Sequence, residues 1–190
     1  MVRKADNKSP GRIQSALLLI ALVPLLSASP QSARRFELVV YGGTAGGVVT
    51  AVSAARAGLK VVLLEPGSHL GGMVSGGLSA TDYGKKEVIG GCALEFFRRL
   101  GSYYQMRRYG QDVAWYFEPH VGEQVLKEMA AEAGVTVLYD HRLRAKDGLL
   151  KEGLRVRQIV MENGSSFSGE VFADCSYEGD LMAQAGVSYT

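Results

Sequence analysis

The sequence predicts an α/β domain with a mostly parallel β-sheet, and two observations predict it. Residues 36–65 run in the order buried strand, glycine-rich turn, helix, buried strand, which is the order of a βαβ unit. Further strands and helices then alternate, and an antiparallel hairpin precedes the last parallel strand. The 190 residues are enough for one sizeable domain with a single core.

The βαβ unit is the clearest part of the pattern. Phe36–Tyr41 (FELVVY) has the length and β-branched content of a buried parallel strand. Val48–Ala57 places small apolar residues on one helical face, and Gly58 stands where a helix C-cap belongs. Lys60–Glu65 (KVVLLE) is the second buried strand.

The later elements are expected from periodicity and turn residues. Pro119 suits the first turn of a helix that Glu118 can cap, and Asn163-Gly164 is a hairpin signal. Residues 67–91 resemble a loop, and residues 101–115 lack clear periodicity. We expect helices over Leu94–Leu100, Pro119–Ala133 and Glu178–Ala185, and strands over Val135–Tyr139 and Val171–Ser176.

The charge distribution argues against a nucleic-acid partner. The net charge of +2 comes from a basic N-terminal segment, and the residues after position 33 hold 17 basic and 18 acidic side chains. The two cysteines, Cys92 and Cys175, form no cluster-ligand pattern, and no metal site is predicted. We interpret both as buried small hydrophobic residues, with a disulfide as the less favoured alternative.

The N-terminus is typical of an export signal. A basic stretch precedes the apolar run Ala16–Leu26, and small residues follow at Ser27–Ser29. A membrane-spanning helix needs about 20 apolar residues, so an uncleaved anchor is the less favoured alternative. We expect residues 1–33 to be signal and leader and residues 34–190 to be the folded domain. The mature protein would be periplasmic or secreted, without a membrane span.

The first motif with chemical content is GGTAGG, between the first strand and the first helix. Aligned to G-x-G-x-x-G, it places Gly42, Thr44 and Gly47 at the motif positions. Backbone N–H groups at the start of such a helix, together with the helix dipole, hold a pyrophosphate. Thr44 departs from the pattern, and we expect Gly43 and Gly46 to relieve the resulting crowding.

The second motif is an acid at the end of the second strand. Glu65 follows Gly47 by 18 residues, where a carboxylate accepts hydrogen bonds from an adenosine ribose. The same charge would repel a 2′-phosphate, which disfavours NADP. The alternative is a glutamate that merely ends a strand.

The third motif favours FAD over NAD. The loop after Glu65 reads PGSHLGGMVSGG, with doublets at Gly71-Gly72 and Gly76-Gly77. Backbone without Cβ atoms can pack against phosphates and a ribityl chain. This order resembles FAD enzymes of the glutathione-reductase structural class. A flexible loop remains the structural alternative, and an NAD-dependent dehydrogenase remains the functional one.

Four segments, residues 39–58, 61–82, 115–129 and 171–190, resemble the FAD-dependent oxidoreductase family. This family includes many secreted bacterial proteins and is distantly similar to the flavin subunit of heterodisulfide reductases. The resemblance implies a Rossmann-like FAD-binding domain and hydride transfer between a small-molecule substrate and flavin. The cofactor-binding residues that we expect are Gly42, Gly43, Thr44, Ala45, Gly46, Gly47, Glu65, Pro66, Gly71, Gly72, Met73, Ser75 and Asp180.

Members of this family are longer than the present sequence. We therefore expect the sequence to be an N-terminal portion that lacks the substrate domain and is incomplete at its C-terminus. Such a portion alone would be a poor enzyme and a marginal FAD binder. A non-catalytic dinucleotide-binding remnant is the alternative from a different functional class.

The sequence identifies no catalytic residue. His120 beside Glu118 could serve as an acid or base, although a histidine there more often packs or caps. His69 lies in the expected cofactor loop. Cys175 is better interpreted as a packed thiol than as a redox thiol. Asp180 is either a flavin-side contact or a helix cap.

Export is directly testable. When the protein is expressed in a bacterium, the mature chain should be found outside the cytoplasm, with its N-terminus between Ser29 and Arg35. N-terminal sequencing of the fractionated protein measures this. Soluble cytoplasmic protein that retains Met1 would contradict the prediction.

Overall fold

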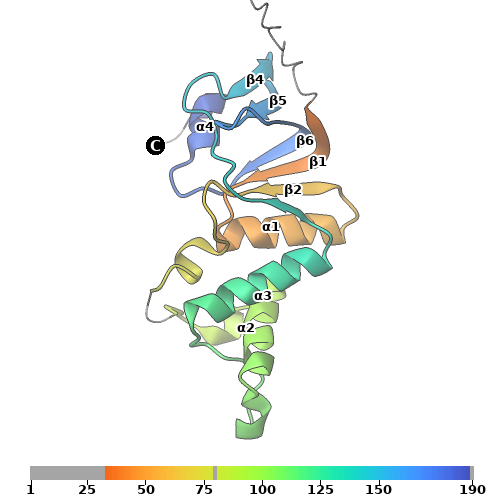
Figure 1. Ribbon diagram of the computed structural model, residues 1–190. Helices are drawn as coiled ribbons and strands as arrows, with labels where there is room; N and C mark the ends of the chain where they lie inside the picture. The colour runs from red at the N-terminus through yellow and green to blue at the C-terminus, as the bar shows by residue number, and fades with distance from the viewer. Residues whose placement is uncertain (1–32, 79–80, 189–190) are drawn as a thin grey trace, which may run out of the picture. The chain divides into compact units, whose positions relative to one another are not determined.

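The computed structural model describes residues 33–78 and 81–188, so the predicted signal segment lies outside the described residues except for its last position. A six-stranded sheet has the order β3-β2-β1-β6-β5-β4 (Figure 1). The strands are β1 (Arg34–Tyr41), β2 (Val61–Leu64), β3 (Thr136–Leu138), β4 (Leu149–Glu152), β5 (Arg155–Val160) and β6 (Ser166–Asp174). The helices are α1 (Ala45–Arg56), α2 (Gly91–Tyr103), α3 (Pro119–Glu132) and α4 (Asp180–Ala185), with short 3-10 turns η1 (Gly72–Val74), η2 (Lys86–Val88) and η3 (Met106–Tyr109).

The parallel half of the sheet consists of β3, β2, β1 and β6. Strand β1 is central there, because Val39 pairs with Val62 of β2 on one side and with Phe172 of β6 on the other. Strand β3 adds to the outer edge of β2 in the same direction. The predicted α/β class and the βαβ unit are therefore confirmed.

The hairpin differs from the expectation. We expected an inserted hairpin and then a separate strand over Val171–Ser176, but β6 is one strand that serves both purposes. Its first residues pair antiparallel with β5, as in Ile159 with Phe167, while the whole strand pairs parallel with β1. The two edges of a strand bond independently, so the same residues can join both neighbours. Strand β4 was not predicted and pairs antiparallel with β5.

Helix ends also differ in detail. Helix α1 begins three residues before its expected start because the Thr44 side chain caps it. Helix α2 extends beyond Leu94–Leu100 at both ends. Helix α3 begins at Pro119 as predicted, but Glu118 makes no side-chain cap. Instead, the Glu118 N–H donates to the Tyr104 hydroxyl at 3.0 Å.

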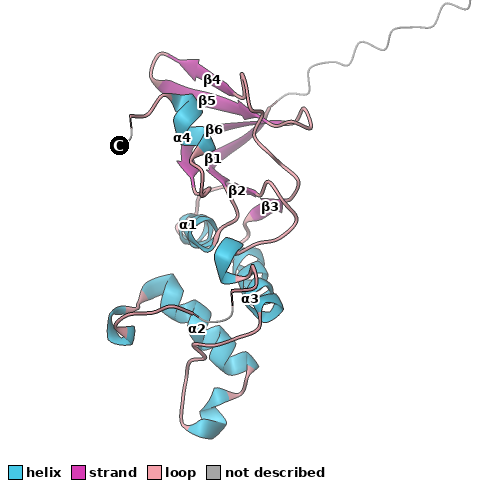
Figure 2. Cartoon of the chain, turned by 90° about the vertical axis from the view of Figure 1, so that its left-hand side faces the viewer, coloured by secondary structure: helices cyan, strands magenta, loops and turns pink. Residues whose placement is uncertain are grey.

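The two faces of the sheet bury separate sets of side chains. Leu38 and Val40 of β1 pack toward α1 and α3, whereas Val39 and Tyr41 pack on the opposite face. This alternation follows from the two-residue period of a strand. Figure 2 shows α1 and α3 next to the parallel strands and α2 farther from the sheet. Within residues 33–78 and 81–188, no helix is long and apolar enough to cross a membrane.

An ion network connects the three longer helices. Arg56 of α1 makes two hydrogen bonds, of 2.6 and 2.8 Å, to the Glu95 carboxylate of α2. Arg99 of α2 donates to Glu95 at 3.0 Å and makes two further bonds to Glu132 of α3. Hydrogen bonds from Arg56 hold the pKa of Glu95 at about 2, well below its ordinary value of 4.5.

This network predicts a pH-dependent contribution to stability. A carboxyl group whose pKa is lower in the folded state stabilises the fold above its unfolded pKa and loses that effect as the pH falls. We expect Glu95→Gln to lower the free energy of unfolding at pH 7 by about 1 kcal/mol, as for a partly exposed ion pair. The difference from the unmodified protein should shrink between pH 4.5 and about 2.

Urea unfolding at several pH values measures this difference. Glu128→Gln on α3 is the matched control, because Glu128 accepts a hydrogen bond from Gln124 and lies outside the network. Equal effects of the two substitutions, or a Glu95 effect that is independent of pH, would show that the network does not stabilise the helices.

Candidate functional site

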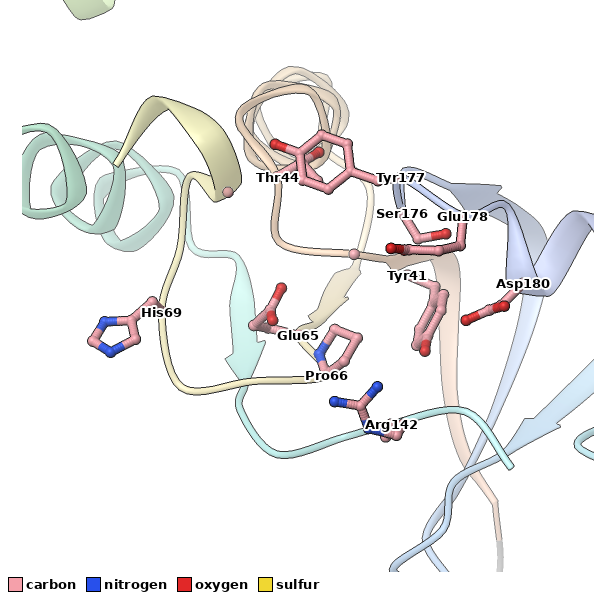
Figure 3. Close-up of a pocket in the computed structure, with 12 residues that line it drawn as sticks. Tyr41, Thr44, Glu65, Pro66, His69, Arg142, Ser176, Tyr177, Glu178 and Asp180 are labelled. Carbon is pink, nitrogen blue, oxygen red and sulfur yellow. The ribbon is translucent and has the colours of Figure 1, made fainter. Parts of the chain in front are cut away.

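A cavity of about 370 Å³ opens where the carboxyl ends of β1, β2 and β6 meet (Figure 3). Parallel strands end at the same edge of a sheet, and ligands of open α/β sheets bind at this edge. The lining residues are Tyr41, Gly42, Thr44, Glu65, Pro66, His69, Gly72, Arg142, Ser176, Tyr177, Glu178 and Asp180.

Two glycines of the first motif are required by the protein's own packing. Gly42 has φ +99°, and a Cβ there would lie 2.6 Å from the Ser176 nitrogen. A Cβ at Gly47 would collide with the Gly42 carbonyl oxygen and would lie 3.1 Å from the Cys175 Cβ. The absence of a Cβ at both positions therefore allows α1 to lie close to β1 and to the end of β6.

Thr44 fits the turn because its side chain points back toward the protein. Its hydroxyl donates to the Cys175 carbonyl at 2.9 Å and accepts the Gly47 N–H at 3.1 Å. A Cβ at Gly46 would meet nothing nearer than the Thr44 hydroxyl at 3.7 Å. Among the hydrogen bonds of the described residues, none uses the Gly46 N–H. The first turn of α1 therefore keeps an open N–H position.

We expected the missing Cβ of Gly43 to make room for a phosphate, and in the structure it makes room for the protein's own side chains. A Cβ at Gly43 would lie 2.6 Å from Glu65 Oε2 and 2.6 Å from the Leu70 side chain. Its missing Cβ therefore admits the acid and the following loop. Of the two glycines expected to make room, only Gly46 faces open space.

Glu65 connects both glycine segments. Its Oε2 accepts the Gly43 N–H at 2.7 Å, and its Oε1 accepts the Gly67 N–H at 2.6 Å. Each carboxylate oxygen carries two lone pairs, so the group can still accept hydrogen bonds from a ligand in the cavity. Glu65 is thus both a structural link and a cavity wall.

The second glycine segment packs directly against the first. The Gly71 N–H donates to the Gly43 carbonyl at 2.7 Å. Glu123 of α3 accepts the Leu70 N–H at 3.2 Å, and the Ser75 hydroxyl donates to the Leu70 carbonyl. These bonds fix the loop that begins after β2.

The expected site residues divide among several surfaces. Ala45, Gly46 and Met73 line a neighbouring apolar groove of about 480 Å³, which begins at the first turn of α1. Ser75 lines a more open hollow of about 680 Å³, which shares Glu65, His69 and Gly72 with the first cavity. The predicted residues that line the first cavity are Gly42, Thr44, Glu65, Pro66, Gly72 and Asp180.

Asp180 is the first residue of α4, and its side chain makes no capping hydrogen bond to that helix. Asp174 performs the capping, because its Oδ2 accepts the Met182 N–H at 2.8 Å. Its Oδ1 accepts the Ser176 N–H at 3.0 Å and so shapes the turn before the helix. The Asp180 carboxylate instead lines the cavity.

Sequence reasoning missed Tyr41 and Arg142. The Tyr41 hydroxyl accepts the Leu143 N–H at 3.1 Å, and burial raises the pKa of the Tyr41 phenol. Arg142 follows β3 and enters the cavity from the side opposite the glycine turn (Figure 3). The aromatic residue directly before Gly42 was a usable signal for Tyr41, whereas no local pattern marks Arg142.

The remaining candidate residues, two cysteines and two histidines, do not form a catalytic arrangement. Cys92 and Cys175 are free thiols, and burial raises the pKa of the Cys175 thiol, which disfavours the reactive thiolate. His120 is exposed, and the His69 Nδ1 lies 3.1 Å from Glu123. Within the described ranges, no cluster of three or more potential ligands could hold a metal ion.

Comparison with known proteins found a matching family model and a curated relative. A family model described as FAD dependent oxidoreductase matches residues 37–190. The 4-oxocyclohexanecarboxylate 2-dehydrogenase of Sinomonas cyclohexanicum is 32% identical over 122 residues, which cover 60% of this chain and 20% of that protein. The chain thus spans about a fifth of the length of this curated relative.

Two solved structures share the fold at low sequence identity. L-proline dehydrogenase from P. horikoshii matches 83% of this chain and 57% of its own, with a TM-score of 0.59 and 13% identity. L-amino acid deaminase from Proteus vulgaris, with its specific insertion sequence deleted, matches 82% of this chain and 57% of its own, with a TM-score of 0.54 and 17% identity. At these identities the similarity concerns the fold alone.

The neighbouring glycines of α1 give a matched test of the site's construction. Gly47→Ala places a Cβ against the Gly42 carbonyl and should lower the free energy of unfolding by about 1–3 kcal/mol, the usual cost of overpacking. Gly46→Ala meets open space and should leave stability unchanged or slightly raised, because alanine favours a helix. Chemical denaturation of both variants decides; equal destabilisation would contradict the assigned packing.

Proposed function

The chain belongs to the family of FAD dependent oxidoreductases, and we propose that it binds the adenosine diphosphate half of FAD in the cavity at the ends of β1, β2 and β6. The observation that carries the proposal is the meeting of three features at one cavity. These are the glycine turn at Gly42, the N-cap residue Thr44 of α1 and the Glu65 carboxylate.

The residues fit a dinucleotide in two respects. The first turn of α1 contains no acid and keeps the Gly46 N–H open, as a pyrophosphate requires. The Glu65 carboxylate, already oriented by two backbone N–H groups, would accept hydrogen bonds from the adenosine ribose hydroxyls. A 2′-phosphate would meet the same negative charge, which supports FAD over NADP.

An apolar surface continues from this position. The groove between η1, α2 and α3 begins at Ala45 and Gly46 and is lined by Phe96, Phe97 and Phe117. An aromatic ring attached to the pyrophosphate would find apolar contacts there. Met73 and Val74 of the loop after β2 line this groove. Hydrogen bonds to Glu123 and to the Gly43 carbonyl fix that loop.

We propose redox chemistry on a small organic molecule as the activity. Bound FAD supplies hydride transfer, and the protein supplies position, electrostatics and exclusion of water. The curated relative is by name a dehydrogenase, and the family model carries the oxidoreductase description, which together support this class. Export to the periplasm or beyond remains part of the proposal and is supported by the basic and apolar N-terminal segments.

Flavin content and Glu65 test the proposal together. Protein incubated with excess FAD should show the visible absorbance of a bound flavin, which an NAD-dependent dehydrogenase lacks. In titrations of apoprotein, Glu65→Ala should weaken FAD binding by about 1–3 kcal/mol because ribose hydroxyls lose a charged acceptor. Glu37→Ala is the matched control, since Glu37 also accepts a backbone N–H, from Lys60 directly before β2, and does not line the cavity.

Unfolding of both variants without FAD separates binding from folding, because Glu65 also supports two backbone groups. Equal FAD affinity in the Glu65→Ala variant and the unmodified protein would make the acid purely structural. An unmodified protein that takes up no FAD would contradict the proposed function. Tightly bound FAD that no small-molecule donor reduces would contradict the redox activity and leave a dinucleotide-binding role.

A further inference from the structure

Arg142 lies in the segment after β3, and the residues before it are held against the cavity walls. The Asp140 N–H donates to the Gly67 carbonyl at 2.9 Å. The His141 N–H donates to the Glu65 carbonyl at 2.9 Å. The backbone that approaches Arg142 is therefore fixed to the same strand end that supplies the acid.

The residue after Arg142 is held as well. The Leu143 N–H donates to the Tyr41 hydroxyl at 3.1 Å, and Tyr41 is fully buried in the floor of the cavity. The Arg142 carbonyl accepts the Glu162 N–H at 2.8 Å. With both neighbours fixed, the Arg142 side chain leaves the backbone at a defined point, and Figure 3 shows it directed into the cavity toward Pro66.

The charges around the cavity are unevenly divided. Glu65, Glu178 and Asp180 line it, and Arg142 is the single arginine or lysine among its lining residues. The ion pairs found among the described residues do not include Arg142. Its planar guanidinium therefore keeps five N–H donors and both faces for a ligand.

The position of Arg142 determines whether it would contact the base or the phosphates of a bound dinucleotide. It lies on the side of the cavity away from Thr44 and the first turn of α1 (Figure 3). A dinucleotide with its phosphates at α1 and its ribose at Glu65 would present the base, not the phosphates, to this side. A guanidinium plane stacks well on an aromatic ring system, whereas a lysine ammonium does not.

We propose that Arg142 is a contact residue for the adenine base of FAD and that Tyr41 positions it through Leu143. This inference rests on the proposed binding of the adenosine half of FAD. Because the base, ribose and phosphates would be held by Arg142, Glu65 and α1 respectively, ADP alone should report the Arg142 contact.

Titration of apoprotein with FAD and with ADP tests the contact. Arg142→Ala should weaken both ligands by the same factor, about tenfold, as for loss of a desolvated stacking contact. Arg142→Lys keeps the charge but loses the plane and should weaken them nearly as much. Arg144→Ala is the matched control, because Arg144 is also exposed but does not line the cavity.

The outcomes separate this inference from the proposed function. Unchanged affinity for FAD and ADP in Arg142→Ala, while the unmodified protein still binds FAD, would overturn the Arg142 contact alone. Full affinity in Arg142→Lys would mean attraction by charge and would also overturn a base contact. Failure of the unmodified protein to bind FAD would instead remove the proposed function.

A double-mutant cycle tests the positioning role of Tyr41. Tyr41→Phe removes the acceptor of the Leu143 N–H and should weaken ADP binding by less than Arg142→Ala does. If Tyr41 acts through Arg142, the double variant should bind ADP as weakly as Arg142→Ala alone. Additive losses would show that Tyr41 acts independently of Arg142.

Discussion

The close approach of the Gly42–Gly47 turn to the end of β6 is the constraint on which the site depends. Gly42 leaves no room for a Cβ beside Ser176, and the Thr44 hydroxyl donates to the Cys175 carbonyl at 2.9 Å. The Cys175 N–H also donates to the Tyr41 carbonyl at 2.7 Å. These contacts join residues that are more than 130 positions apart in the chain. Because β6 ends there, the turn between β6 and α4 lines the same cavity as Gly42.

The electrostatics of the cavity depend on which hydrogen-bond donors each nearby carboxylate already has. Glu65 accepts hydrogen bonds from two backbone N–H groups, and the ion pairs of the described residues give it no arginine partner. Asp174 is used in capping α4. In the proposed complex, Arg142 would be the cation beside the base, and backbone N–H groups of α1 would hold the phosphates. An acidic cavity can in this way accept an anionic ligand if the phosphates lie at the helix terminus.

The local part of the fold was predictable from sequence, and the non-local part was not. The βαβ unit and Glu65 come from contiguous patterns whose partners lie within about 30 residues, as expected for such units. The continuous β6 was missed because its pairing with β1 and its pairing with β5 concern different edges of one segment. Arg142 could not be identified because its place in the cavity depends on Tyr41 and Glu65, about a hundred and about eighty positions earlier.

The glycines of the motif are explained by close packing within the protein, and they say little about which ligand is bound. A Cβ at Gly42, Gly43 or Gly47 would collide with this chain's own atoms, and only the Gly46 position is open. A match to the glycine pattern therefore indicates a strand, turn and helix packed closely together, as any dinucleotide-binding βαβ unit requires. Selection among dinucleotides has to come from the side chains that line the cavity. The motif predicts Thr44 and Glu65 among these side chains, whereas a residue such as Arg142 is recognised only once the sheet has brought its segment to the cavity.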